Sequence, residues 1–225
     1  MAQTTQPDRP LRIAHRGMPR RARENTLASF ALALAAGADG IELDVHATSD
    51  GVVVVHHDPV LPGGWAIAAL SHAEVWEATS ATAPLCTLHE VCALVGGRAE
   101  LFVEIKGDGI EQLVVQALEG YDGAAAIHSF DHALIQRLAS SECGYRLGAL
   151  IEADVADARA LMERTGASDL WPHYSLVTSA LVRDVHSAGG RVIPWTVNEP
   201  VDIGRVTALG VDGICTDDVG LLPTT

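Results

Sequence analysis

The chain is poor in positive charge. Its 225 residues include 15 Lys and Arg against 29 Asp and Glu, which gives a formal net charge of −14 at pH 7. Because proteins bind duplex nucleic acid largely through Lys and Arg contacts to phosphates, this balance argues against a nucleic-acid partner. All of the cations are arginines except Lys106. A single ammonium in a chain that otherwise uses guanidinium groups suggests a specific role for Lys106, such as contact with a phosphate or with carboxylates.

Long apolar runs and closely paired cysteines are also missing. The longest nearly apolar stretch, residues 27–38, is shorter than the roughly 20 residues that span a bilayer, so no membrane span is expected. The N-terminal residues are polar and contain no apolar signal-peptide core, so a cytoplasmic location is expected. The cysteines, Cys86, Cys92, Cys143 and Cys215, form no C-x-x-C pair. Buried free thiols are therefore expected rather than disulfides or a zinc site.

Short apolar runs alternate along the chain with helical patterns. Hydrophobic residues make up 48% of the sequence, enough for a large core. The runs are apolar on both faces, which is typical of parallel strands covered by helices. Candidate strands lie at 12–14, 40–46, 52–56, 99–105, 124–129, 146–152, 168–173, 191–197 and 213–216. Candidate helices lie at 24–36, 88–95, 110–119, 132–141, 155–165, 179–188 and 200–209.

The number of strand–helix units indicates the fold. The strand at 52–56 follows the strand at 40–46 through Ser49-Asp50-Gly51, a hairpin-like turn without room for a helix, so the two strands count as one unit. The eight resulting units predict an α/β fold of the (β/α)8 or TIM-barrel type, although such barrels usually have about 250 residues. A doubly wound open sheet more often has five or six strands. No linker divides the chain, so we expect a single domain over residues 1–225.

Charged residues inside apolar strands are the first candidates for a functional site, because TIM-barrel enzymes carry their chemistry at the carboxyl ends of the strands. Glu42 and Asp44 are two residues apart and therefore share one face of a strand. Glu104 and Lys106 repeat this spacing. Three carboxylates at one barrel mouth would repel one another without a cation, and oxygen ligands favour Mg²⁺, Ca²⁺ or Mn²⁺ over zinc. The alternative is ordinary surface charge, which the apolar neighbours of Glu42 and Asp44 disfavour.

Two histidines also end predicted strands. His15 follows the first strand, and His57 follows the hairpin strand. Because imidazole can give or take a proton near neutral pH, two histidines at one mouth can serve as general acid and general base. His128, at the end of another strand, is equally compatible with packing and with a site. The other histidines are expected on the surface or in packing roles.

Several motifs that contain these residues follow one another along the chain. They are Ile13-Ala14-His15-Arg16-Gly17, Gly40-Ile41-Glu42-Leu43-Asp44-Val45, His57-Asp58, Val103-Glu104-Ile105-Lys106, Trp195-Thr196-Val197-Asn198 and Thr216-Asp217. Together they closely resemble the glycerophosphodiester phosphodiesterase family, and the resemblance covers nearly the whole chain. A single Glu-x-Asp would be weak support, whereas the combined set is hard to obtain by chance.

The resemblance implies a (β/α)8 barrel that uses a divalent ion, often Ca²⁺ or Mg²⁺, to hydrolyse glycerophosphodiesters to sn-glycerol 3-phosphate and an alcohol. It also implies a role for each motif residue. The ion would be held by Glu42, Asp44 and Glu104, the acid–base pair would be His15 and His57, the phosphate would be held by Arg16 and Lys106, and the pocket would be lined by Trp195. The substrate is then a small phosphodiester, and the sequence does not indicate an oligomeric state.

The chain departs from the family at the substrate side of the site. Residues 60–70 lead quickly into the next segment, so an Arg-Thr-Thr-like element is absent and the inserted cap is reduced. A wider mouth would suit lysophospholipids, so a lysophospholipase D-type or other phosphodiesterase activity is an alternative. Trp65 and Ile67 would then contact an acyl chain, although packing is the simpler role. A barrel that binds a metal or a ligand without catalysis is the alternative from another class.

Overall fold

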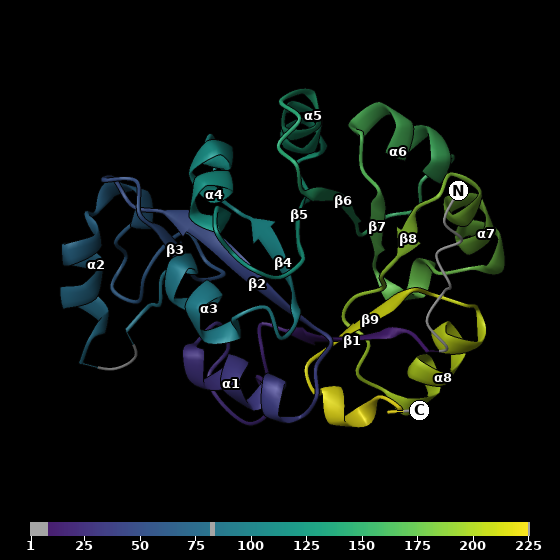
Figure 1. Ribbon diagram of the computed structural model, residues 1–225, viewed down its shortest axis with the longest axis horizontal. Coiled ribbons are helices and arrows are strands. Elements are labelled where there is room, and N and C mark those ends of the chain that lie inside the picture. Colours follow the sequence, from purple (N-terminus) through teal and green to yellow (C-terminus); the bar gives the residue numbers. More distant parts are fainter. Residues whose placement is uncertain (1–8, 82–83, 225) are drawn as a thin grey trace.

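The computed structural model describes residues 9–81 and 84–224. Its strands form one sheet that curves into a nearly closed barrel, and the helices lie around the outside (Figure 1). The order of the parallel strands is β9-β1-β2-β4-β5-β6-β7-β8, and β3 pairs only with β2, in the antiparallel direction. The predicted TIM barrel and the predicted hairpin after its second strand are both confirmed.

The elements have the following bounds. The strands are β1 (Leu11–His15), β2 (Gly40–Ala47), β3 (Val53–Val55), β4 (Glu100–Ile105), β5 (Ala125–Ser129), β6 (Arg146–Ile151), β7 (Asp169–Pro172), β8 (Arg191–Val192) and β9 (Gly213–Thr216). The α-helices are α1 (Leu27–Ala35), α2 (His72–Thr79), α3 (Leu88–Val95), α4 (Glu111–Leu118), α5 (His132–Ser140), α6 (Ala158–Thr165), α7 (Ser179–Ser187) and α8 (Pro200–Ala208). Three short 3₁₀ helices are η1 (Ile67–Ala69), η2 (Tyr174–Leu176) and η3 (Val219–Leu221).

The barrel closes between β8 and β9, although β8 is much shorter than the predicted strand at 191–197. Pro194 interrupts the predicted strand because it has no N–H to donate to a ladder. The chain nevertheless continues beside β9. Asp212 N donates to Val192 O at 2.9 Å, Cys215 N donates to Pro194 O at 3.0 Å, and Val197 N donates to Cys215 O at 2.9 Å. These bonds join the last strands into the ring.

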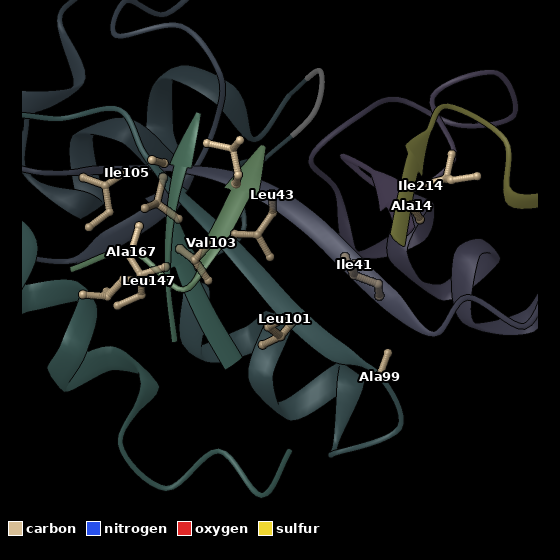
Figure 2. Close-up of a cluster of buried hydrophobic side chains, with 14 of the residues drawn as sticks. Ala14, Ile41, Leu43, Ala99, Leu101, Val103, Ile105, Leu147, Ala167 and Ile214 are labelled. Atoms are coloured by element: carbon tan, nitrogen blue, oxygen red, sulfur yellow. The ribbon is translucent and has the colours of Figure 1, made fainter. Parts of the chain in front are cut away.

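Alternation along the strands separates two apolar layers. On β4, Leu101 and Val103 face the helices, and Figure 2 shows them beside Ile41 and Leu43 of β2 in the larger buried cluster. The residues between them point into the barrel, where Phe102 belongs to a smaller cluster with residues of the other strands. Since side chains alternate with period two, this arrangement also turns Glu42, Asp44 and Glu104 inward.

Helices α1 and α6 begin three residues later than predicted, and α2 was not predicted. Helix α1, predicted from residue 24, begins at Leu27, because Asn25 has a φ of 56° and the Thr26 side chain caps the helix by accepting from Ser29 N. Helix α2 lies outside every predicted helix. Its capping box, Ser71 with Glu74, is the sequence signal that identifies it.

The reduced cap folds back onto the hairpin. Leu61 and Ile67 are buried in a small cluster with Val54 of β3 and Val75 of α2. Ile67 therefore has a packing role, whereas Trp65 is 62% exposed. None of the helices in the described ranges has the length and apolar character needed to cross a bilayer. The four cysteines are free thiols, two of them buried and two half-buried, so the prediction of free thiols is confirmed while full burial holds for Cys86 and Cys215.

Candidate active site

Strand register brings the inward-facing polar residues together at the carboxyl ends of the strands. In the parallel ladders, His15 of β1 pairs with Glu42 of β2. Asp44 of β2 pairs with Glu104 of β4, which in turn pairs with His128 of β5. Because paired residues on adjacent strands point the same way, the five side chains converge on the interior near one end of the barrel.

Glu42, Glu104 and His128 form a group that could hold a metal ion. Each is buried, and their candidate ligand atoms all lie within 4.8 Å of one another. Two carboxylates and an imidazole are suitable ligands for a divalent cation. His128 joins this group through its register with Glu104, which the spacing along the chain does not reveal. The sequence signal for His128 is its position at the end of a predicted strand, which is compatible both with a functional site and with packing.

Asp44 lies beside this group but contacts cations and an amide instead. Arg16 Nε lies 2.9 Å from Asp44 Oδ2, and Lys106 Nζ lies 3.5 Å from Oδ1. Asn25 Nδ2 donates to Oδ2 at 2.8 Å. Burial acts to raise the pKa of the fully buried Asp44 carboxyl, but Arg16 and Lys106 outweigh it and the pKa is lowered. Asp44 as a metal ligand stays a prediction.

Lys106 lies beside Glu104 as well as Asp44. Its Nζ lies 2.7 Å from Glu104 Oε1. Burial and the Asp44 charge raise the pKa of Glu104 to about 8, although Lys106 acts in the opposite direction. Burial also acts to lower the pKa of Lys106, but Glu104 and Asp44 outweigh it and the pKa is raised. The site therefore concentrates negative charge that one lysine and Arg16 offset only in part, which is the electrostatic condition that favours a bound cation.

His15 is oriented by a carboxylate from the last strand–loop junction. His15 Nδ1 lies 2.7 Å from Asp217 Oδ1, while its Nε2 lies 4.0 Å from Glu42 Oε2. Asn198 Nδ2 donates to the other oxygen of Asp217 at 2.7 Å. Burial acts to lower the pKa of His15, but Asp217 and Glu42 outweigh it and the pKa is raised. With Nδ1 directed at Asp217, Nε2 is the ring nitrogen that faces the interior.

His57 has a similar partner but a more exposed position. It lies in the segment after β3, and its Nδ1 is 2.7 Å from Asp58 Oδ1. His46 Nε2 donates to the His57 carbonyl at 3.1 Å, which fixes the backbone there and gives His46 a packing role. His15 thus ends β1 and His57 follows β3, and each has a carboxylate beside its Nδ1.

The turn after β1 explains the His-Arg-Gly motif. Arg16 has a φ of 53° and its backbone N donates to Glu42 Oε2 at 3.1 Å. Gly17 follows with a φ of 88°, and a Cβ at this position would lie 2.4 Å from Ser29 Oγ. Only glycine therefore lets the chain pass α1 closely enough to place Arg16 at the site.

A cavity of about 350 Å³ opens over these residues. Every predicted site residue except Asp44 lines it, and so does His128. Phe130, Leu150, Trp171 and Trp195 form an apolar wall. Trp195 Nε1 donates to Trp171 O at 3.0 Å, which holds the indole in place. A cavity with carboxylates, two cations, two carboxylate-paired histidines and an apolar wall is suited to binding a small anionic ester and moving protons on it.

Known proteins with similar sequences and structures share the fold and an activity. Residues 15–221 match the glycerophosphoryl diester phosphodiesterase family. A glycerophosphodiester phosphodiesterase of Caldanaerobacter subterraneus subsp. tengcongensis is 32% identical over 226 residues, which cover 92% of this chain and 93% of the relative.

Two solved structures are also similar. A glycerophosphodiester phosphodiesterase from Thermotoga maritima superposes with a TM-score of 0.83 at 27% identity, covering 94% of this chain and 96% of the other. An Oleispira antarctica phosphodiesterase, solved with the product sn-glycerol-3-phosphate, has a TM-score of 0.83 at 26% identity and 93% coverage of both chains. The match over nearly the whole barrel, together with the geometry of the cavity, shows that this chain belongs to the glycerophosphoryl diester phosphodiesterase family.

Proposed function

We propose that this protein is a metal-dependent hydrolase that cleaves glycerophosphodiesters to sn-glycerol 3-phosphate and an alcohol, with His15 and His57 as the acid–base pair. The observation that carries the proposal is that both histidines line the same cavity as the Glu42–Glu104–His128 group and as both cations. The product bound by the Oleispira antarctica relative supports the same direction of cleavage.

The metal would be held by Glu42 and Glu104, and His128 and Asp44 would be further ligands. The residues fit such an ion, because the group is buried and carries more carboxylates than nearby cations offset. Mg²⁺ and Ca²⁺ suit the carboxylates, and the imidazole adds Mn²⁺ as a candidate. When bound, the ion supplies a positive charge that polarises a phosphoryl oxygen.

The protein's own groups then bind the phosphate and move protons. Lys106 and Arg16 line the cavity and would contact the non-bridging oxygens, which places positive charge where negative charge develops. One imidazole Nε2 would take a proton from the nucleophile, and the other would protonate the departing alkoxide. With water as the nucleophile this gives glycerol phosphate directly, whereas a glycerol hydroxyl would give a cyclic phosphate that a water molecule must then open. Asp217 and Asp58, each 2.7 Å from an Nδ1, would keep both rings oriented.

Hydrolysis of glycerophosphocholine and glycerophosphoethanolamine with added Mg²⁺, Ca²⁺ or Mn²⁺ tests the proposal. We expect turnover by the wild type and a loss of at least about 100-fold in His15→Ala, the range that general acid–base catalysis contributes. His89→Ala, an exposed histidine on α3, is the matched control and should keep full activity. Metal binding by calorimetry without hydrolysis of any of these esters would instead favour a barrel that has lost catalysis.

A further inference from the structure

The lining of the active-site cavity differs between its two halves. The residues from β1, β2, β4 and the segment after β3 include both cations, Arg16 and Lys106, and the two acid–base histidines. The residues that β5 to β8 contribute include no Lys or Arg and carry the apolar wall. In the strand order, β6 lies four positions from β1 in either direction around the ring, so these two halves face each other.

The far half presents rigid aromatic surface. Phe130 follows β5 and is 38% exposed. Its ring contacts Trp195 edge-to-face, with centroids 5.4 Å apart. Trp195 is also fixed by an edge contact to His173 at 5.6 Å, and its Nε1 is occupied by the Trp171 carbonyl. Phe130 already has the Lys106 ammonium over its ring, with Nζ 5.7 Å from the centroid. Trp195 is therefore the ring that offers carbon and π surface to a ligand rather than a hydrogen-bond donor.

A carboxylate without a counter-ion lies in the same half. Glu152 follows β6, is exposed, and lines the cavity. Within the described ranges it makes no hydrogen bond and no ion pair, unlike Glu42 and Glu104 on the other side. Strand register places it level with the aromatic wall, because Ile151 pairs with Pro172, and the next residue, His173, bridges to Trp195.

A phosphodiester has two ester arms, and a phosphate bound by Arg16 and Lys106 as proposed would direct one of them across the cavity. We propose that the far half binds the alcohol arm and selects an alcohol that carries an ammonium group, with Glu152 as the counter-ion and Trp195 as the aromatic surface. This inference rests on the proposed function and deepens it. Ammonium groups are attracted both by a carboxylate and by the faces of aromatic rings. A neutral alcohol gains neither attraction, and an anionic one is repelled by Glu152.

The kinetic test compares two glycerophosphodiesters that differ in the alcohol. Glycerophosphocholine carries a quaternary ammonium, and glycerophosphoglycerol carries a neutral alcohol. For Glu152→Gln we expect kcat/KM for glycerophosphocholine to fall about three- to fivefold, the upper range of one exposed ion pair, while glycerophosphoglycerol changes less than about 1.5-fold. Asp154→Asn removes the same charge from the same loop but lies outside the cavity lining, so it should leave both rates unchanged.

A binding measurement separates failure of this inference from failure of the proposed function. In the His15→Ala background, titration calorimetry should show that Glu152→Gln weakens the binding of glycerophosphocholine about three- to fivefold and that of glycerophosphoglycerol little. The binding measurement does not need turnover, so it tests Glu152 even if the wild type hydrolyses neither ester. Absence of hydrolysis would overturn only the proposed function. An unchanged ratio between the two esters in Glu152→Gln, by kinetics or by binding, overturns the role of Glu152.

Discussion

The end of the barrel opposite the cavity contains an ion-pair network around one buried carboxylate, and its loss should be costly. Asp169, at the start of β7, is fully buried. Arg191 donates to both of its carboxylate oxygens at 2.9 and 2.6 Å, and Arg146 donates to Oδ1 at 2.6 Å. Arg191 also donates to both oxygens of Glu100 at 3.0 and 2.9 Å. Because these residues begin their strands, the network should determine stability rather than chemistry.

Substitution of Arg191 by Met keeps an apolar stem and removes the charge. Asp169 would then retain only Arg146, and Glu100 would lose its arginine. Removing one partner from a buried ion pair costs about 3–5 kcal/mol, because the other charge stays buried without compensation. We therefore expect the free energy of unfolding to fall by about 3–5 kcal/mol. For a chain of this size the melting temperature would fall by roughly 6–20 °C, at about 2–4 °C per kcal/mol.

Urea unfolding followed by circular dichroism measures this loss, with Arg159→Met as the control. Arg159 forms an exposed pair with Glu163 at 2.8 Å on α6, and such pairs contribute about 0.3–0.5 kcal/mol. The double variant Arg191→Met/Asp169→Asn should recover part of the loss, because a neutral amide replaces the stranded charge. If Arg191→Met costs no more than Arg159→Met, the reasoning from burial is refuted.

Three further outcomes concern the mouth of the barrel. Gly17→Ala should lower both melting temperature and activity by more than Gly109→Ala, because both residues have positive φ but an added Cβ meets neighbouring atoms within 4 Å only at Gly17; equal effects would contradict the close approach. Asp217→Asn should lower kcat at least about 100-fold and alter the pH–rate profile, because His15 loses the carboxylate on its Nδ1; a lower rate with an unaltered profile would point to a merely structural role. Metal affinity should weaken by up to about tenfold per pH unit below pH 8, because burial raises the pKa of Glu104 to about 8 and a proton then competes with the cation; calorimetric titration with Mn²⁺ measures this, and pH-independent affinity would show that Glu104 is not a ligand.

Local sequence pattern was sufficient to predict the architecture and the inward-facing acids. The alternation around Glu42, Asp44 and Glu104 depends only on the period-two geometry of a strand, so it can be recognised in a single segment. The count of strand–helix units likewise follows from local periodicity. Apolar spacing does not reveal α2, whose start is identified instead by the capping box at Ser71.

The partners of these residues depended on the tertiary structure. His128 joins Glu42 and Glu104 because of the register between β4 and β5. Asp217 reaches His15 although 202 positions separate them in the chain. Such contacts depend on how strands slide and close into a ring, and a shift by one residue would turn each side chain to the other face. The residue types capable of the chemistry were therefore visible in the sequence, whereas the ring of eight strands determined which of them meet.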